Sequence, residues 1–295
     1  MKLKKQIMYK SVCFTFLVFV LLSFSGHVFA QRAFFVYNSD GQQVELDQII
    51  RETKNKSHVF FGELHNNPIG HWLQLELTKA LFQSHGDRLV IGVEMFEADN
   101  QLLIDEYFGD KISQKNFEDE VRLWKNYKTD YKPILEFAKE NKLKFIATNI
   151  PRRYANIVYH NGIDVLAELS EQAKSYIAPL PIEIDTTQAS YQEISKMVEG
   201  HKGKNMMAAQ AVKDATMAYF TLANSGKKTV FLHLNGSYHS DRKEGIVNFL
   251  SRDIPLKKIL TITTVSQDQI EQLDDKNRQL ADYIIVVDSD MTTTH

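Results

Sequence analysis

Six short apolar runs constrain the fold of this chain more than any other feature. They read HVFFGELH (58–65), RLVIGVEMF (88–96), KLKFIATNI (142–150), KTVFLHLNG (228–236), KILTITTV (258–265) and DYIIVVDS (282–289). Apolar and polar residues do not alternate in these runs, which is typical of strands covered by helices on both faces. Helical patterns lie between them, for example at 68–84 and 244–252. The sequence therefore predicts an α/β fold with a mostly parallel sheet flanked by helices.

Two long stretches interrupt this rhythm. Residues 97–141 and 152–226 have a helical pattern with little strand character. We expect these two stretches to form an inserted helical lobe. The α/β domain is then predicted to consist of residues 31–96, 142–151 and 227–295.

The first thirty residues form the three parts of a secretory signal peptide. A basic segment, MKLKKQIMYK, precedes the apolar segment SVCFTFLVFVLLSFSG, and HVFA then places Val28 and Ala30 at the small-residue positions of a cleavage site. We expect cleavage after Ala30, the alternative being an uncleaved N-terminal anchor. Cys13 begins the apolar segment instead of following it, so lipidation through Cys13 is not expected. The predicted destination is the periplasm, the cell exterior or an association with the outer membrane.

Charge and cysteine content exclude several classes of function. Cleavage would remove four lysines and no acid, which moves the formal net charge from −2 to −6. A mildly acidic chain argues against nucleic acid as a partner. The only cysteine, Cys13, lies in the predicted signal peptide, so the mature chain would have no disulfide, no thiolate zinc site and no cysteine nucleophile.

Polar side chains gather where the first four apolar runs end. These are Glu63 and His65, then Glu94, then Asn149, then Asn235 and His239. Ligands of open parallel sheets bind outside the carboxyl ends of the strands. We therefore expect His65, Glu94, Asn149 and His239 to line one pocket below the helical lobe. Polar loops at strand ends are common, but a carboxylate inside VIGVEMF needs a partner because isolated burial is costly.

Two of these strand ends share the string Gly-x-x-His, as GELH (62–65) and GSYH (236–239). Two histidines with Glu63 or Glu94 could form a His₂-carboxylate site for a divalent metal. Alternatively, one histidine could be a general base that a carboxylate aligns. His65, Glu94 and His239 are the catalytic candidates, and His65, His239, Glu63 and Glu94 are the metal-ligand candidates.

The longer strings that surround these residues resemble a known family. They are FFGELHNNPIGHWLQLEL, VIGVEMFEADNQ, YKPILEFAKENKLKFIATNIPRR, AAQAVKDATMAY and LNGSYHSDRKEGI. Over residues 44–265 the chain resembles the ChaN-like haem-binding family of bacterial uptake proteins, which is related to the TraB and Tiki proteins and, more distantly, to the erythromycin esterases. The resemblance implies an α/β domain with a helical lobe, haem held by a tyrosine in a homodimer, iron acquisition and an outer-membrane uptake partner. The Tiki relatives imply a second activity, a metal-dependent protease that would use His65, Glu94 and His239.

Residues 149–162, NIPRRYANIVYHNG, offer candidates for a haem site. Tyrosine, histidine and methionine can all ligate haem iron. Tyr154 directly follows a loop at the predicted sheet edge and is the leading axial candidate, while Arg152 and its neighbour Arg153 could pair with the propionates. The further candidates are Tyr159, His160 and Met207. The alternative for these tyrosines is ordinary packing with a wet hydroxyl.

Several other polar residues are expected to support the strand-end cluster. Met207, Gln210, Asp214 and Met217 share one helical face, and Gln210 and Asp214 could reach the cluster from it. His71 would lie in the first turn of the helix that follows His65.

Two functions from different classes follow. The first is an exported haem-binding protein of iron acquisition. The second is a metal-dependent hydrolase that uses the paired Gly-x-x-His strings and a buried Glu94. A third possibility is a binding module in which the cluster has no activity.

Overall fold

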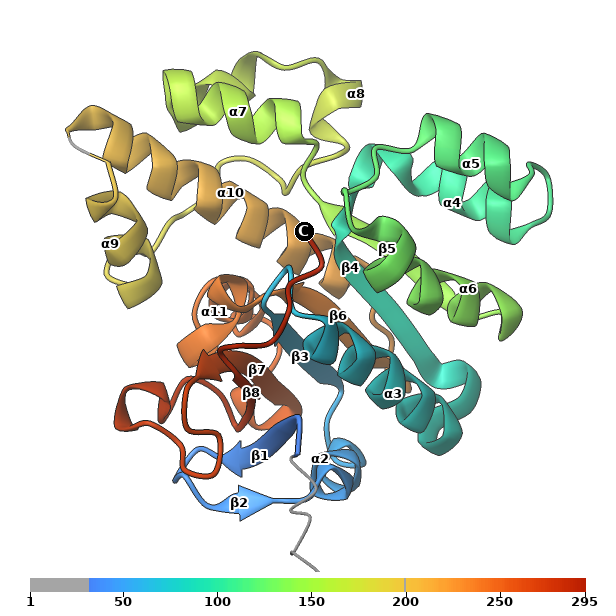
Figure 1. The fold of residues 1–295 in the computed structure, drawn as a ribbon. Coiled ribbons are helices and arrows are strands. Elements are labelled where there is room, and N and C mark those ends of the chain that lie inside the picture. The colour runs from blue at the N-terminus through green and yellow to red at the C-terminus, as the bar shows by residue number, and fades with distance from the viewer. Residues whose placement is uncertain (1–31, 199) are drawn as a thin grey trace, which may run out of the picture. The chain divides into compact units, whose positions relative to one another are not determined.

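Eight strands form a single sheet in the computed structural model, which describes residues 32–198 and 200–295 (Figure 1). The strands are β1 (Phe34–Asn38), β2 (Gln43–Val44), β3 (His58–Glu63), β4 (Leu89–Glu97), β5 (Lys144–Asn149), β6 (Val230–Gly236), β7 (Ile259–Gln267) and β8 (Tyr283–Asp288). Their order across the sheet is β2-β1-β8-β7-β3-β6-β4-β5. All six predicted strands are confirmed, as β3 to β8.

The α-helices lie between and beside these strands. They are α2 (Leu46–Thr53), α3 (Pro68–His85), α4 (Gln101–Phe108), α5 (Gln114–Glu120), α6 (Lys132–Glu140), α7 (Arg152–Asn161), α8 (Glu171–Lys174), α9 (Ala189–Lys196), α10 (His201–Ala223) and α11 (Ile246–Leu250). Two short turns also position the site: the π-turn η3 (Tyr127–Tyr131) and the 3₁₀ turn η5 (Ser237–His239).

The sheet is parallel from β8 to β5, as expected. Strand β3 pairs in parallel with both β6 and β7, and β4 pairs in parallel with both β5 and β6. Strand β1 is antiparallel to both β2 and β8. The β1–β2 hairpin was not predicted, because only the short run FFVYN marks it. The four strands that carry the polar ends, β3, β6, β4 and β5, are neighbours.

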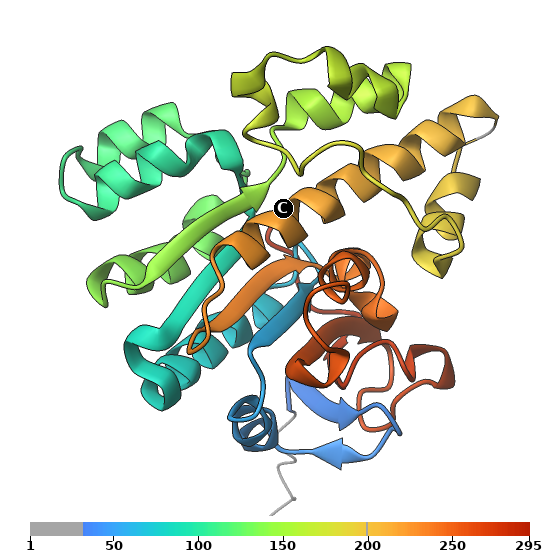
Figure 2. The ribbon, with the colours of Figure 1, turned by 180° about the vertical axis from the view of Figure 1, so that it is seen from behind.

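Helices bury both faces of the sheet, which explains why its strands do not alternate apolar with polar residues. Phe61 of β3 belongs to the core cluster that contains Leu77 of α3, whereas the adjacent Phe60 belongs to the cluster that contains Met217 of α10. Figure 1 shows α3 in front of the sheet, and Figure 2, seen from behind, shows α10 crossing the opposite face.

The predicted helical lobe falls into two parts. Helices α4 to α6 share the main core cluster, where Ile104, Phe117 and Leu135 are buried together with Val93 of the sheet. Helix α7 packs instead against α10, through a second cluster that includes Val158 and Val212. Residues Phe34–His295 form one compact unit. The boundaries of the lobe remain a prediction.

Strand β4 is irregular at the place where Glu94 lies. Its pairing with β5 is regular up to Val93 and resumes only at Glu97, which faces Asn149 of β5. Such an irregularity bends a strand and changes the direction of a side chain. It therefore separates Glu94 from the regular pairing and lets its carboxylate reach the end of β6.

Capping residues fix the start of α3, the helix that follows β3. The side chain of Asn67 accepts a hydrogen bond of 2.8 Å from the backbone N–H of Gly70, and Pro68 occupies the first turn. Both are favoured at a helix N-terminus. Helix α3 consequently begins five residues after Glu63 and brings its first turn back over the strand end.

The predicted signal peptide, residues 1–30, lies outside the described residues. Among the residues that are described, no helix combines the length and the hydropathy that crossing a membrane requires. At the other end of the chain, Thr294 donates its backbone N–H to the carbonyl of Asn66 (2.9 Å) and its hydroxyl to Asp130 (2.8 Å). The final residues are therefore held beside the carboxyl edge of the sheet.

Candidate functional site

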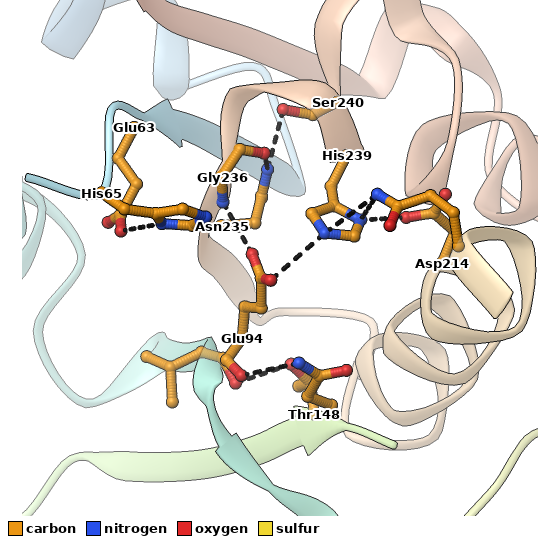
Figure 3. A network of polar contacts seen from close by, with 12 residues as sticks. Glu63, His65, Glu94, Thr148, Asp214, Asn235, Gly236, His239 and Ser240 are labelled. Atoms are coloured by element: carbon orange, nitrogen blue, oxygen red, sulfur yellow. Dashed lines mark hydrogen bonds and ion pairs between the residues drawn. The ribbon is translucent and has the colours of Figure 1, made fainter. Parts of the chain in front are cut away.

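His239 lies between two buried carboxylates at the end of β6. Its Nε2 is 3.2 Å from Oε1 of Glu94, and its Nδ1 bonds to Oδ1 of Asp214 on α10 (Figure 3). The hydroxyl of Tyr191 donates to Oδ2 of Asp214 at 2.8 Å, and the side-chain amide of Gln210 is 3.1 Å from Nδ1 of the histidine. These five residues are here called the His239 cluster. Gln210 and Asp214 therefore contact the strand-end residues, as the sequence suggested.

Opposing effects set the charges in the His239 cluster. Burial alone would lower the pKa of His239, but Glu94 and Asp214 raise this pKa to about 10. Burial alone would raise the pKa of Glu94, but His239, His65 and the N–H of Gly236 hold it well below its ordinary value. An imidazolium is thus paired with an ionised Glu94 in the protein interior.

A second group of residues surrounds His65 at the end of β3. It consists of His65, Glu63, His71, Gln74 and Tyr131 and is here called the His65 cluster. Its Nδ1 is 2.9 Å from Oε1 of Glu63. Glu63 also accepts hydrogen bonds from Tyr131 of η3 (2.7 Å) and from Gln74 of α3 (2.6 Å). His71, on α3, places Nε2 3.1 Å from the backbone carbonyl of His65. The buried His71 is therefore a support for His65 and not a surface residue.

The His65 ring remains accessible, unlike the other side chains of its cluster. Its side chain is 44% exposed, whereas that of Glu63 is fully buried. Burial lowers the pKa of His65, but the hydrogen bond that its ring donates to Glu63 and the charges of Glu94 and Glu63 raise it above its ordinary value. No described residue bonds to Nε2 of His65. The free nitrogen of an oriented imidazole is consequently available at the pocket.

The two Gly-x-x-His strings fit against each other. A Cβ atom on Gly236 would lie 2.7 Å from Cε1 of the His65 ring, and a Cβ atom on Gly62 would lie 2.9 Å from Cα of Ser237. Each glycine therefore leaves the space that the other string occupies. The repeated glycine is explained by this close approach and not by a need for left-handed backbone.

A pocket of about 390 Å³ opens above these residues. Its lining consists of Glu63, Leu64, His65, Glu94, Ile194, Met197, Gln210, Lys213, Gly236, Ser237, Tyr238 and His239. The prediction that His65, Glu94, Asn149 and His239 line one pocket is confirmed for His65, Glu94 and His239 and is wrong for Asn149. Asn149 lies behind the pocket, and its side-chain amide donates to the backbone carbonyl of Glu94 at 3.1 Å.

A divalent metal site at these residues is not supported. Glu63 already accepts three hydrogen bonds, and both ring nitrogens of His239 face carboxylates. Within residues 32–198 and 200–295, no group of three or more His, Cys, Asp or Glu side chains is placed to hold a metal ion. The expected set of His65, His239, Glu63 and Glu94 forms ion pairs instead.

The haem candidates lie on α7 and α10, outside the pocket lining. Tyr154 is partly buried, and the guanidinium of Arg153 lies 4.4 Å from its ring centroid and donates to its hydroxyl at 3.2 Å. Arg153 also binds Asp99 at 2.6 Å, whereas the neighbouring Arg152 is exposed. Three further candidates are also placed: Tyr159 and Met207 are partly buried, and His160 is exposed.

Several residues of the site escaped the sequence analysis. They are Gln74, Asn126, Asp130, Tyr131 and Tyr191. Asn126 donates to the carbonyl of His65 (2.8 Å) and to Asp130 (2.6 Å). The dense run of polar and aromatic residues at 124–131, WKNYKTDY, was the available signal.

Comparisons with known proteins agree with this fold. The structure of a ChaN from Campylobacter jejuni with cofacially bound haem has a TM-score of 0.64 at 19% identity, covering 86% of this chain and 96% of that one. A Bacillus cereus protein has a TM-score of 0.50 at 11% identity, covering 82% of this chain and 91% of that one.

A curated relative is also similar in sequence. The chloroplastic protein RETICULATA-RELATED 5 of Arabidopsis thaliana is 24% identical over 229 residues. That match covers 70% of this chain but only 31% of the plant protein. The model of the family described as "Haem-binding uptake, Tiki superfamily, ChaN" matches residues 49–250. This match spans well over half of the sequence, so the chain belongs to the ChaN haem-binding uptake family of the Tiki superfamily.

Proposed function

We propose that this protein binds haem and serves in haem uptake, with Tyr154 as the axial ligand. Membership of the ChaN family supports haem as the ligand. Bound haem supplies an iron centre that a tyrosine oxygen can ligate. The residues of this chain would provide that oxygen, an apolar contact surface and a cation for the propionates.

The observation that carries this proposal is the surroundings of Tyr154. Its ring packs on an apolar cluster that includes Ile150, Ala155 and Val158, and Arg153 holds it in one orientation. The exposed Arg152 has no carboxylate partner among the described residues, so it is free to bind a propionate. Arg153 is less suited to that role because Asp99 already binds it.

A haemin titration with matched variants tests the ligand. We expect the wild type to bind haemin with a tyrosinate-type high-spin absorption spectrum, and Tyr154→Phe to lose that spectrum while it stays folded. Tyr238→Phe and Tyr159→Phe are the matched controls and should keep it. Loss of the spectrum in Tyr238→Phe alone, with Tyr154→Phe unchanged, would show that the ligand belongs to the pocket and that the assignment to Tyr154 is wrong.

Homodimerisation is the second part of the proposal. Haem held at the partly exposed Tyr154 would leave one porphyrin face uncovered, and a second copy of the chain could cover it. Sedimentation velocity with and without haemin should therefore show a haemin-dependent dimer. A species that remains monomeric when saturated with haemin contradicts this part only.

Export and an outer-membrane uptake partner complete the proposal. The N-terminal sequence supports export, because residues 1–30 have the pattern of a cleaved signal peptide. Mass spectrometry of the exported protein should find a chain that begins at Gln31. An N-terminus at Met1 in that fraction would instead indicate an uncleaved anchor.

A second candidate function, hydrolysis by acid–base chemistry, is favoured by the free Nε2 of His65. This nitrogen faces a pocket that also contains the ionised Glu94 and the His239 imidazolium. His65 could accept a proton from an attacking water, with Glu63 orienting the ring. Ester and peptide substrates should then be cleaved by the wild type and by Tyr154→Phe, but not by His65→Ala. Equal background rates in the wild type and His65→Ala would refute hydrolysis without affecting haem binding.

A further inference from the structure

A further cavity lies at the opposite edge of the sheet from the Gly-x-x-His strings. It measures about 900 Å³ and is formed where the chain enters β3, β4, β6 and β7. Residues 54–58 and 225–230 line it, together with Ser84, His85, Arg88, Leu222, Ile254, Pro255 and Lys258. Because the strands are parallel, their amino ends meet at this edge. We call it the basic cavity. Neither proposed function uses it.

Positive charge dominates the lining of the basic cavity. Six cationic side chains line it: Lys54, Lys56, Arg88, Lys227, Lys228 and Lys258. No Asp or Glu is found among the described residues that form its wall. This composition is unusual for a chain whose formal net charge is −2. The cations come from four separate connections, so folding brings them together.

Most of these cations have no carboxylate to neutralise them. Lys56 pairs with Glu52 at 3.1 Å. Arg88 donates to the backbone carbonyl of His85 at 3.2 Å, and Lys258 donates to that of Asn55 at 3.3 Å. Neither of these two has an acidic partner in the described part of the chain, and the same holds for Lys54, Lys227 and Lys228. Such a concentration of unpaired like charge is unfavourable unless an anion offsets it.

Helix ends account for only part of this pattern. Helices α2, α3 and α10 end here, and a cation near each C-terminus is stabilising. That effect explains Lys54, Arg88 and one lysine after α10. It does not explain a second lysine after α10 or Lys258, which precedes β7.

The pKa of the buried His85 is affected by the same positive charges. It lies in the wall of the cavity, and its Nε2 is 3.2 Å from the hydroxyl of Thr53. Burial lowers the pKa of His85, and the charges of Arg88 and Lys54 lower it further. The hydroxyl of Ser84 adds an uncharged donor to the wall, whereas those of Ser57, Ser225 and Thr229 already donate to backbone carbonyls.

We propose that the basic cavity is a binding site for a small ligand that carries several phosphate groups. Each phosphate monoester has a charge of about −1.5 to −2 at pH 7, so about three of them balance the five cations that have no carboxylate partner. Lysine ammonium groups and hydroxyls bind phosphate oxygens, and the volume accommodates several such groups. The source is either a free polyphosphorylated molecule or the headgroup of a phospholipid, which share this chemistry.

Calorimetric titration with inorganic triphosphate tests the proposal on the whole exported chain. The test variant carries Lys54→Gln, Lys227→Gln and Lys228→Gln. The matched control carries Lys111→Gln, Lys202→Gln and Lys204→Gln, which are equally exposed lysines outside the cavity and give the same net charge. We expect the wild type and the control to bind, and the test variant to bind at least about tenfold more weakly. Added salt should weaken binding in the wild type more than in the test variant.

Vesicle competition separates the two sources of phosphate. If phosphatidylcholine vesicles that contain a phosphatidylinositol bisphosphate displace triphosphate and pure phosphatidylcholine vesicles do not, the site accepts a lipid headgroup. Binding that neither vesicle disturbs supports a free ligand. Absence of triphosphate binding by the wild type, or equal affinity in the two triple variants, overturns the proposal. Neither result bears on haem binding at Tyr154.

Discussion

Oε1 of Glu94 lies 3.2 Å from Nε2 of His239, although one residue lies within β4 and the other follows β6. Both side chains are at least 94% buried. Removing water from two charges is costly, and only their mutual attraction and further hydrogen bonds offset that cost. The pair therefore holds the two strand ends in one arrangement, and each partner depends on the other.

Loss of either partner should consequently be severe. We expect Glu94→Gln to lower the free energy of unfolding by about 3 to 5 kcal/mol, because it leaves the imidazolium of His239 with one carboxylate fewer. Glu97→Gln is the matched control on the same strand, since Glu97 pairs with a half-exposed Arg122 at 2.7 Å. It should cost less than about 1 kcal/mol. Guanidinium unfolding measures both variants, and equal losses would contradict the importance of the buried pair.

The carboxylate of Glu63 should control the protonation of His65. Its hydrogen bond raises the pKa of the histidine against the effect of burial, so Glu63→Gln should lower that pKa. NMR titration of the imidazole measures the change directly. Glu76→Gln, on the exposed side of α3, serves as the control and should leave the titration unchanged. An unaltered titration in Glu63→Gln would mean that Glu63 does not set the charge of the pocket histidine.

A methyl group added at Gly92 should test how tightly the sheet core is packed around this residue. A Cβ atom there would lie 2.4 Å from the ring of Phe231 and 3.1 Å from that of His233. Overpacking of this kind costs about 1 to 3 kcal/mol, so Gly92→Ala should lower the melting temperature. Gly226→Ala has no neighbour closer than 3.7 Å and is the matched control. A melting temperature unchanged in Gly92→Ala would show that Phe231 can move aside.

Stability should be greatest near pH 6.5. Burial lowers the pKa of His58 and of His233 from the ordinary 6.5 to about 4. Between pH 6.5 and 4 the unfolded chain thus binds more protons at these two histidines, and stability falls as pH falls. Their combined effect outweighs the opposite effect of Asp241, whose pKa burial raises to about 7. His239 behaves oppositely, because its pKa of about 10 makes the folded chain bind more protons above pH 6.5. Stability therefore also falls as pH rises towards 10.

Melting temperatures measured across this pH range check the expectation, with two variants as internal comparisons. His58→Gln should flatten the acidic side, and His239→Gln should flatten the alkaline side while lowering stability overall. A melting temperature that rises steadily from pH 6.5 to 9 in the wild type would show that His239 is not the dominant group there.

The sequence contains enough information for the sheet and for the line of polar strand ends, because both depend on local patterns and on a topological rule. Uninterrupted apolar runs identified β3 to β8, and parallel strands bring Glu94 and His239 to one edge. The β1–β2 hairpin could not be inferred, because β2 has only two residues and the other partner of β1, strand β8, is distant in the sequence.

The residues that support the site could not be predicted from the sequence, for a different physical reason. Tyr131 reaches Glu63 because residues 127–131 form a π-turn, a rare geometry with no reliable sequence pattern. Tyr191 reaches Asp214 only through the packing of α9 on α10. The same limit applied to the metal hypothesis, because composition alone cannot show that both nitrogens of His239 already face carboxylates.

The position of β6 between β3 and β4 also limits when this protein can fold. Strands β3 and β4 are synthesised long before β6, yet they do not pair with each other; each pairs with β6. Until the ribosome has released residues 230–236, both strands present unpaired edges, which are the parts of a sheet most prone to aggregation. The nascent chain should therefore need protection over much of its length. Strand β6 joins β3 to β4, and the turn that follows it brings His239 into the pocket in the same step.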